Sequence, residues 1–235
     1  MIDKIAASLP EAVAGIRDGS TVMIGGFGTS GVPLELVGAL IEQGACELTV
    51  VSNSAGNADN ALAALLKTGR VRKIICSFPR QPDSWVFDEL YRAGRIDLEL
   101  VPQGSLAERI RAAGAGIGGF FTPTGYGTQL AADREVREIR GRMHVFEEAI
   151  HGDIALVKAE AGDRWGNLTY RKAARNFGPI MATAAARTIA SVHELVPLGA
   201  LDPEGIVTPG IFVDCVVKIP RLASCASDSL PSRAA

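Results

Sequence analysis

The stretch DGSTVMIGGFGTSGVP, residues 18–33, indicates the fold class more directly than any other part of the chain. Its apolar run 21–24 lacks polar alternation, which is typical of a strand buried on both faces of a sheet. A glycine-rich turn follows, and Pro33 then precedes a helical stripe of apolar residues that stops at Gly44. A buried strand, a tight turn and a helix together predict the first unit of a parallel α/β sheet.

The same alternation continues outward from this unit. Strands are expected at 48–51, 71–77, 96–101, 153–159, 188–192 and 211–218, and helices at 5–16, 59–68, 83–93 and 179–186. Glycines within 114–127 predict an extended loop region. The pattern predicts an α/β fold, an open, mostly parallel sheet with helices on both faces. One domain is expected over 1–220, followed by a small, polar and disordered tail over 221–235.

Composition excludes several classes of function. The 235 residues are 47% hydrophobic and 21% charged, which suits one packed core without disulfide bonds. A net charge of −2 supplies no overall basic field for nucleic acid or an anionic membrane. The four cysteines show no paired spacing, and neither a signal peptide nor a membrane-spanning run is recognisable. We therefore expect a cytoplasmic protein that contacts neither nucleic acid nor membrane.

The glycine cluster allows more than one interpretation. Residues 26–31 match G-x-G-x-x-G between a strand and a helix, as in dinucleotide sites. Such a site also needs an acidic residue after the second strand, where this chain has Ser52-Asn53-Ser54. A nicotinamide or flavin site is therefore disfavoured. A tight turn without a ligand and an anion site at the helix N-terminus both stay open.

Other catalytic motifs are missing from the sequence. It contains no G-x-S-x-G nucleophile elbow and no G-x-x-x-x-G-K-[ST] phosphate loop. The three histidines and four cysteines have no metal-ligand spacing, so no metal is expected. The chain thus shows no self-contained catalytic constellation.

Four ordered blocks resemble the α subunits of class I coenzyme A transferases. They are 18–33; VPQGSLAERIR at 101–111; FTPTGYGT at 121–128; and GNLTYRKAARNF at 166–177. The resemblance covers about residues 3–219 and implies the coenzyme A transferase (NagB/RpiA-like) type of α/β fold. Within the family, SFPRQ at 77–81 and NFGPI at 176–180 are most similar to members that use 3-oxoadipate.

The resemblance implies transfer of CoA from succinyl-CoA to 3-oxoadipate, a step of aromatic degradation, with no dissociable cofactor. The family's nucleophile is a glutamate in a Ser-Glu-Asn-Gly motif, which forms an anhydride and then a glutamyl-CoA thioester in a ping-pong route. This sequence lacks that motif. The nucleophile is therefore expected on a separate β subunit, and two α and two β chains would follow the family's habit.

The resemblance also assigns roles to particular residues. Gln103 matches the family's amide donor to the oxyanion, and Asn53 matches an asparagine near the substrate. The loop formed by Gly25, Gly26, Phe27, Gly28, Thr29, Ser30 and Gly31 is expected to bring backbone N–H groups to CoA or substrate. The second carboxylate of 3-oxoadipate needs a cation, for which Arg80 and Arg171-Lys172 are candidates and Arg80 is favoured.

Three alternatives stay open at this point. The acceptor acid could be acetoacetate, since the same family contains succinyl-CoA:acetoacetate transferases. The chain could also be a CoA-binding module without catalysis, or a nucleotide-dependent oxidoreductase. A partner that carries Ser-Glu-Asn-Gly would count against the binding module, and lack of NAD(H) binding would exclude the oxidoreductase.

Overall fold

A nine-stranded sheet runs through the computed structural model, which describes residues 2–57, 61–80 and 83–221. The strands lie in the order β1-β12-β11-β9-β2-β3-β4-β5, and β10 pairs with β9 off this path. All pairs along the path are parallel, and β10 is antiparallel to β9. The strands are β1 (Ile5–Ala6), β2 (Thr21–Ile24), β3 (Leu48–Val51), β4 (Val71–Cys76), β5 (Asp97–Leu100), β9 (Gly152–Gly162), β10 (Leu168–Thr169), β11 (Ala185–Leu195) and β12 (Cys215–Lys218).

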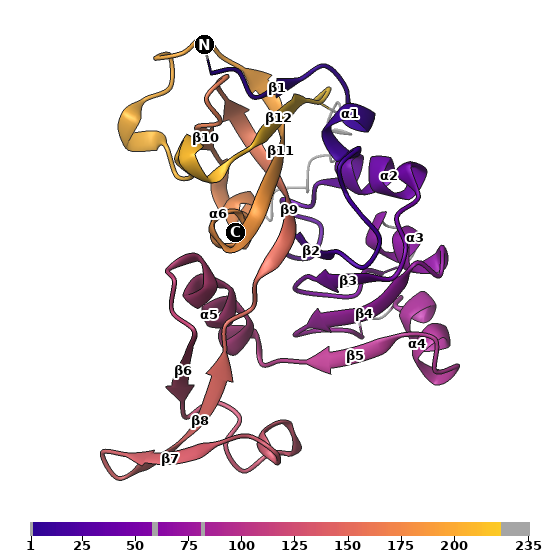
Figure 1. Cartoon of the computed structure of the whole chain (residues 1–235), viewed down its shortest axis with the longest axis vertical. Helices are drawn as coiled ribbons and strands as arrows, with labels where there is room; N and C mark the ends of the chain where they lie inside the picture. Colours follow the sequence, from indigo (N-terminus) through magenta and orange to yellow (C-terminus); the bar gives the residue numbers. More distant parts are fainter. Residues whose placement is uncertain (1, 58–60, 81–82, 222–235) are drawn as a thin grey trace, which may run out of the picture.

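Helices cover both faces of this sheet, as the sequence predicts. They are α1 (Leu9–Val13), α2 (Leu34–Gln43), α3 (Ala61–Lys67), α4 (Trp85–Arg92), α5 (Gln103–Gly114) and α6 (Gly178–Ala184). Figure 1 shows α1 to α4 on one side of the sheet and α5 and α6 on the other. Successive side chains of a strand point to opposite faces. Val22 and Ile24 accordingly join the core under α1–α4, whereas Met23 joins the core under α5 and α6.

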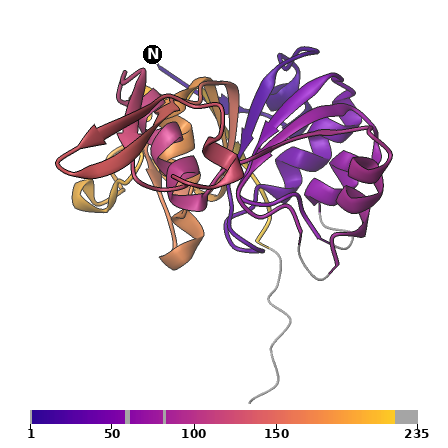
Figure 2. The ribbon, with the colours of Figure 1, turned by 90° about the horizontal axis from the view of Figure 1, so that it is seen from below.

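A small antiparallel sheet forms where the sequence predicts an extended loop. Its strands are β6 (Gly119–Thr122), β7 (Val136–Ile139) and β8 (Arg142–Glu148), in the order β6-β8-β7. Figure 2 shows this sheet projecting from the body of the molecule. Phe121 and Phe146 pack on each other across β6 and β8, with ring centroids 5.2 Å apart. The loop interpretation of 114–127 is thus wrong for its central part, which pairs with a partner far along the chain.

The helix expected over 5–16 is shorter than predicted. Ile5 instead lies in β1, which pairs with Val216 of β12 at the edge of the sheet. Pro10 lies in the first turn of α1, and Ser8 caps that turn by accepting a hydrogen bond from the Glu11 amide at 3.3 Å. Proline lacks an N–H and clashes with the preceding turn, so the helix cannot extend back through it. The predicted tail 221–235 lies outside the described residues except for Arg221, which pairs with Glu160.

The order of the strands places a topological switch between β9 and β2. The chain adds β3, β4 and β5 on one side of β2, and β9, β11 and β12 on the other. In open α/β sheets, ligands bind beyond the carboxyl ends of the strands at such a switch. No helix of the described part of the chain is long and apolar enough to cross a membrane.

Candidate active site at the carboxyl edge of the sheet

The candidate residues gather at one edge because the strands that precede them are parallel. The glycine loop 25–31 follows β2, Asn53 follows β3, the segment 77–80 follows β4 and Gln103 follows β5. Carboxyl ends of parallel strands meet at the same edge of a sheet, so residues separated by 78 positions in the chain become neighbours there.

Asn53 and Gln103 are in direct contact. The Gln103 amide donates a hydrogen bond to Asn53 Oδ1 at 2.8 Å, and Ser77 Oγ donates to the same oxygen at 2.9 Å. Asn53 is 4% exposed, and its backbone carbonyl accepts from the amides of Ser77 and Phe78 at 3.2 and 3.0 Å. The buried Asn53 therefore orients the exposed Gln103 amide, which begins α5.

This orientation leaves Gln103 with a hydrogen to offer. An amide nitrogen carries two hydrogens, and Asn53 accepts only one of them. The Gln103 nitrogen makes no second hydrogen bond with the described residues. A neutral, pre-oriented N–H at a substrate-facing edge is the kind of group that stabilises a developing oxyanion. Ser77 was not singled out from the sequence, although a polar residue directly after a buried strand is a signal that could have found it.

The glycine loop is a tight turn held by a distant asparagine. Phe27 and Ser30 exchange two backbone hydrogen bonds of 3.0 Å around Gly28 and Thr29. Asn176 Oδ1 accepts from the Gly26 amide at 3.1 Å, and its Nδ2 donates to the Ser30 carbonyl at 3.0 Å. Asn176 thereby connects the loop to the block 166–177, which lies 145 residues further along the chain from Gly31.

Part of the loop's backbone is already used inside the protein. The amides of Gly25, Gly26, Phe27 and Ser30 donate to Leu156, Asn176, Ser30 and Phe27 respectively. The amides of Gly28, Thr29 and Gly31 have no acceptor among the described residues. Only these three could donate to a ligand without breaking an existing bond. The expectation for the loop therefore narrows to its tip and its last glycine.

Gly31→Ala is expected to destabilise the protein more than Gly28→Ala. Both glycines have left-handed backbone, with φ of 71° and 59°, which costs alanine about 1–2 kcal/mol. A Cβ at Gly31 would also collide with the Ala174 carbonyl oxygen, whereas a Cβ at Gly28 would meet nothing within 4 Å. The collision should add about 1–3 kcal/mol. Thermal unfolding of the two variants measures the difference, and equal losses would contradict the close approach of the loop to Ala174.

Arg80 lies apart from the Asn53–Gln103 pair. Its Nε donates to Asp88 Oδ1 of α4 at 2.8 Å, and its side chain is 58% exposed. It lines a groove of about 380 Å³ with Ser77, Phe78 and Leu100 among other residues. Asp88 already balances its charge, and no described contact joins it to Gln103. Binding of a distal carboxylate by Arg80 stays a prediction.

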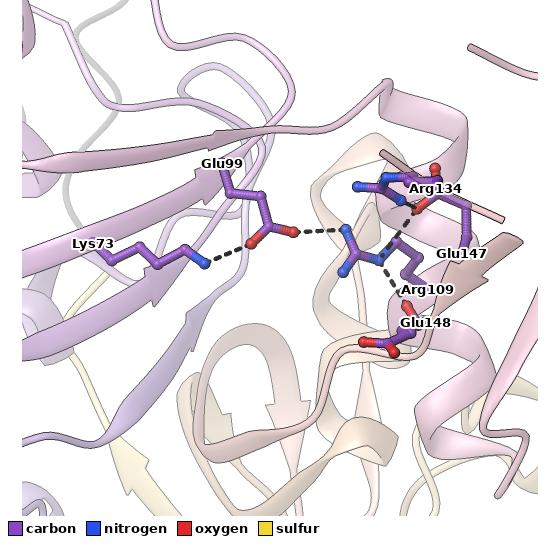
Figure 3. Close-up of polar contacts among 6 residues, drawn as sticks. All are labelled: Lys73, Glu99, Arg109, Arg134, Glu147 and Glu148. Carbon is purple, nitrogen blue, oxygen red and sulfur yellow. Dashed lines mark hydrogen bonds and ion pairs between the residues drawn. The ribbon is translucent and has the colours of Figure 1, made fainter. Parts of the chain in front are cut away.

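An ionic network holds α5, and with it Gln103, against the rest of the molecule (Figure 3). Arg109 of α5 contacts Glu99 of β5 at 2.8 Å and the Glu148 carbonyl of β8 at 2.7 Å. Glu99 is in turn 2.6 Å from Lys73 of β4, and Arg134 pairs with Glu147. Burial alone would raise the pKa of Glu99, but hydrogen bonds from Lys73 and Arg109 outweigh it and lower that pKa below its ordinary value.

The cysteines are unsuited to nucleophilic catalysis. Burial raises the pKa of the Cys76 thiol to about 12, and burial also raises the pKa of Cys215. A hydrogen bond with Asp18 raises the pKa of Cys46. Only the thiolate is a good nucleophile, so these three groups are inert at neutral pH. The described residues also contain no group of three or more histidine, cysteine or acidic side chains placed to hold a metal ion.

Comparison with known proteins gives close relatives over nearly the whole chain. A subunit of the 3-oxoadipate CoA-transferase of Pseudomonas putida is 65% identical over 224 residues, which are 95% of this chain and 97% of that protein. The corresponding 3-oxoadipate CoA-transferase subunit of Acinetobacter baylyi is 62% identical over 227 residues, which are 97% of this chain and 100% of that one.

Solved structures share the fold. The acyl-CoA transferase YdiF of Escherichia coli O157:H7, in a thioester complex with CoA, matches 94% of this chain with a TM-score of 0.81 and 23% sequence identity. This chain spans about half of that longer chain, 48% of its length. A family model described as Coenzyme A transferase matches residues 6–219. The chain therefore belongs to the coenzyme A transferase family.

Proposed function

We propose that this chain is the α subunit of a CoA-transferase that moves CoA from succinyl-CoA to 3-oxoadipate. The observation that carries the proposal is the Gln103 amide, which Asn53 orients at the carboxyl edge of the sheet while no described carboxylate contacts either residue. Such a site offers an oxyanion donor but no nucleophile. The names of the relatives from P. putida and A. baylyi support both the acceptor acid and the role of one subunit within a larger enzyme.

The partner subunit supplies the nucleophile in this proposal. A glutamate carboxylate of its Ser-Glu-Asn-Gly motif attacks the thioester carbonyl of succinyl-CoA and expels the CoA thiolate, which leaves a succinyl-glutamyl anhydride. The thiolate then attacks the glutamyl carbonyl of the anhydride, which releases succinate and forms a glutamyl-CoA thioester. The carboxylate of 3-oxoadipate reverses the same two steps and leaves as 3-oxoadipyl-CoA. Both substrates thus use one site in turn.

Gln103 acts at each addition step. Every attack on a carbonyl creates a tetrahedral centre whose oxygen carries negative charge, and a pre-oriented donor lowers the energy of that state. A neutral amide does so without neutralising the attacking carboxylate, which a lysine or arginine would pair with. Asn53 and Ser77 hold the amide in place beforehand, so little reorganisation is needed when the charge develops.

The glycine loop contributes donors beside this centre. The free amides of Gly28, Thr29 and Gly31 bind an anionic or carbonyl group of CoA or the acid in our proposal. CoA enters as a substrate, and the reaction needs no resident cofactor. The enzyme acts in the cytoplasm on the route that degrades aromatic acids, as a heterotetramer of two α and two β chains. The free thiols of Cys46, Cys76 and Cys215 suit that reducing compartment.

The first test is CoA transfer with and without the partner. Formation of 3-oxoadipyl-CoA from succinyl-CoA is expected only when this chain is combined with the subunit that carries Ser-Glu-Asn-Gly, and each chain alone should be inactive. Turnover by this chain alone would contradict a nucleophile on the partner. Preference of the complex for acetoacetate over 3-oxoadipate would favour the second acceptor, and inactivity with both acids would overturn the proposal.

A further inference from the structure

The largest cavity given by the described residues lies at the switch between β9 and β2, with a volume of about 870 Å³. Its position follows from unequal strand lengths. The pairing of β2 with β9 ends at Ile24 and Leu156, whereas β9 and β11 stay paired as far as Gly162 and Leu195. The part of β9 beyond Leu156 therefore borders a space that 170–174 and Ser30–Gly31 enclose.

Positive charge dominates the wall of this cavity. Its lining includes Lys158, Arg171, Lys172 and Arg221, against one carboxylate, Glu160. Arg221 pairs with Glu160, and Lys158 lies 3.3 Å from Glu35 of α2. Arg171 and Lys172 have no acidic partner among the described residues. Two positive charges at the mouth of the cavity are thus left without a counter-charge.

The segment that carries these two cations is held in a constrained shape. Lys172 has a φ of 51°, a left-handed conformation that is uncommon for a residue other than glycine. Asn176 stabilises the turn by donating to the Ala173 carbonyl and to the Ser30 carbonyl, both at 3.0 Å. Strained backbone of this kind persists where the surrounding contacts enforce it, and it is frequent at ligand sites.

A histidine adds an unpartnered polar atom to the same wall. His193 lines the cavity from β11, and its buried Nδ1 has no hydrogen-bond partner among the described residues. Buried polar atoms of native proteins nearly always have a partner, which here can be a ligand or a water. Excess positive charge and an unsatisfied nitrogen together indicate a site for an anion.

The geometry points to the carboxylate of the acid substrate that does not react. This inference rests on the proposed function, because succinate and 3-oxoadipate are both dicarboxylates and occupy one site in turn. β9 lies two strands from β3, about 10 Å at the usual spacing between strands, and long arginine and lysine side chains shorten that separation. We therefore assign Arg171 and Lys172 to the distal carboxylate, in place of Arg80, whose charge Asp88 already balances.

The test compares two acceptors that differ only at the distal end. 3-Oxohexanoate has the chain length of 3-oxoadipate and a methyl group where the second carboxylate stands. In the assembled enzyme, the double variant Arg171→Gln/Lys172→Gln is expected to lower kcat/KM for 3-oxoadipate by about 10- to 100-fold. The value for 3-oxohexanoate should stay within about twofold, and Lys172→Arg should restore part of the loss. Arg92→Gln, an exposed arginine of α4, serves as the matched control.

Each outcome supports the inference or overturns it. Equal losses for both acceptors, with weaker inhibition by free CoA, would mean that the cations bind the phosphates of CoA instead. A selective loss in Arg80→Gln but not in the double variant would return the role to Arg80. If the double variant matches the wild-type enzyme on 3-oxoadipate, the inference fails while the proposed function stands. A wild-type complex that does not use 3-oxoadipate would overturn the proposed function first, and the inference with it. Size-exclusion chromatography of every variant checks that the complex assembles.

Discussion

Gln103→Ala is expected to lower kcat of the assembled enzyme by about 100- to 1,000-fold, the range found when one oxyanion donor is removed. The effect should fall on kcat more than on KM, because the amide is needed most when negative charge develops on the carbonyl oxygen. Steady-state kinetics with succinyl-CoA and 3-oxoadipate measure both constants. Gln103 is exposed at the first turn of α5, so the substitution should leave the fold intact.

Two further variants separate this role from a structural one. Gln129→Ala removes another exposed glutamine that precedes no strand or helix of the candidate site, and its kcat should be unchanged. Asn53→Ala keeps the donor but removes the acceptor that orients it, so kcat should fall by less than in Gln103→Ala. Unchanged kcat in Gln103→Ala, or an increase in KM alone, would show that the residue only binds substrate or caps α5.

The parallel sheet could be predicted because its strands are apolar on both faces. Val22, Met23 and Ile24 read as one uninterrupted run, and each of them is buried in the structure. Helix ends with strong local signals were equally clear. Gly44 has a φ of 97° and ends α2 where the apolar stripe stops. Local chemistry decides such features, so one sequence is sufficient to find them.

Features that depend on distant pairing were not predictable in this way. The helix α5 does carry apolar residues at helical spacing, with Leu106, Ile110 and Ala113 on its buried face, but its start at Gln103 depends on the end of β5. The strands β7 and β8 pair with each other and with β6, and most of their residues are exposed or half-buried. Without a buried face, alternation of polar and apolar residues gives a weak signal.

The candidate site was only partly visible for the same reason. Gln103 and Asn53 came from a resemblance, and nothing in the residues themselves predicted their contact. The free cations Arg171 and Lys172 could be distinguished from Arg80 only after the ion pair of Arg80 with Asp88 was known. Whether a surface charge is available to a ligand depends on neighbours that the fold brings together.

The second large effect is expected at Arg109, whose loss should cost about 3–5 kcal/mol of stability, as for other buried ion pairs broken on one side. The Arg109 side chain is 9% exposed, and that of Glu147 is 5% exposed at a distance of 3.6 Å. Arg109→Ala would leave Glu147 and Glu99 with fewer partners and the Glu148 carbonyl without a donor. A loss of this size should lower Tm by about 10 °C.

Arg111→Ala is the matched control for this variant. It removes an arginine from the same helix, but the Arg111–Glu108 pair is 52% and 50% exposed. Exposed pairs of this kind contribute about 0–1 kcal/mol, so Tm should hardly change. Similar losses in the two variants would contradict the structural importance of the network.

The difference between wild type and Arg109→Ala should shrink in acid. Because the folded pKa of Glu99 lies below its ordinary 4.5, the carboxylate stabilises the folded state above that pH, and the contribution is lost as pH falls through the folded pKa. Arg109→Ala removes one of the two partners that keep this pKa low, so it forfeits part of the contribution already at neutral pH. Unfolding curves at pH 7 and pH 4 measure the change. Arg109 also anchors the helix that begins with Gln103, so a variant stable enough to purify should lose kcat, because the donor no longer meets the developing oxyanion in a fixed position.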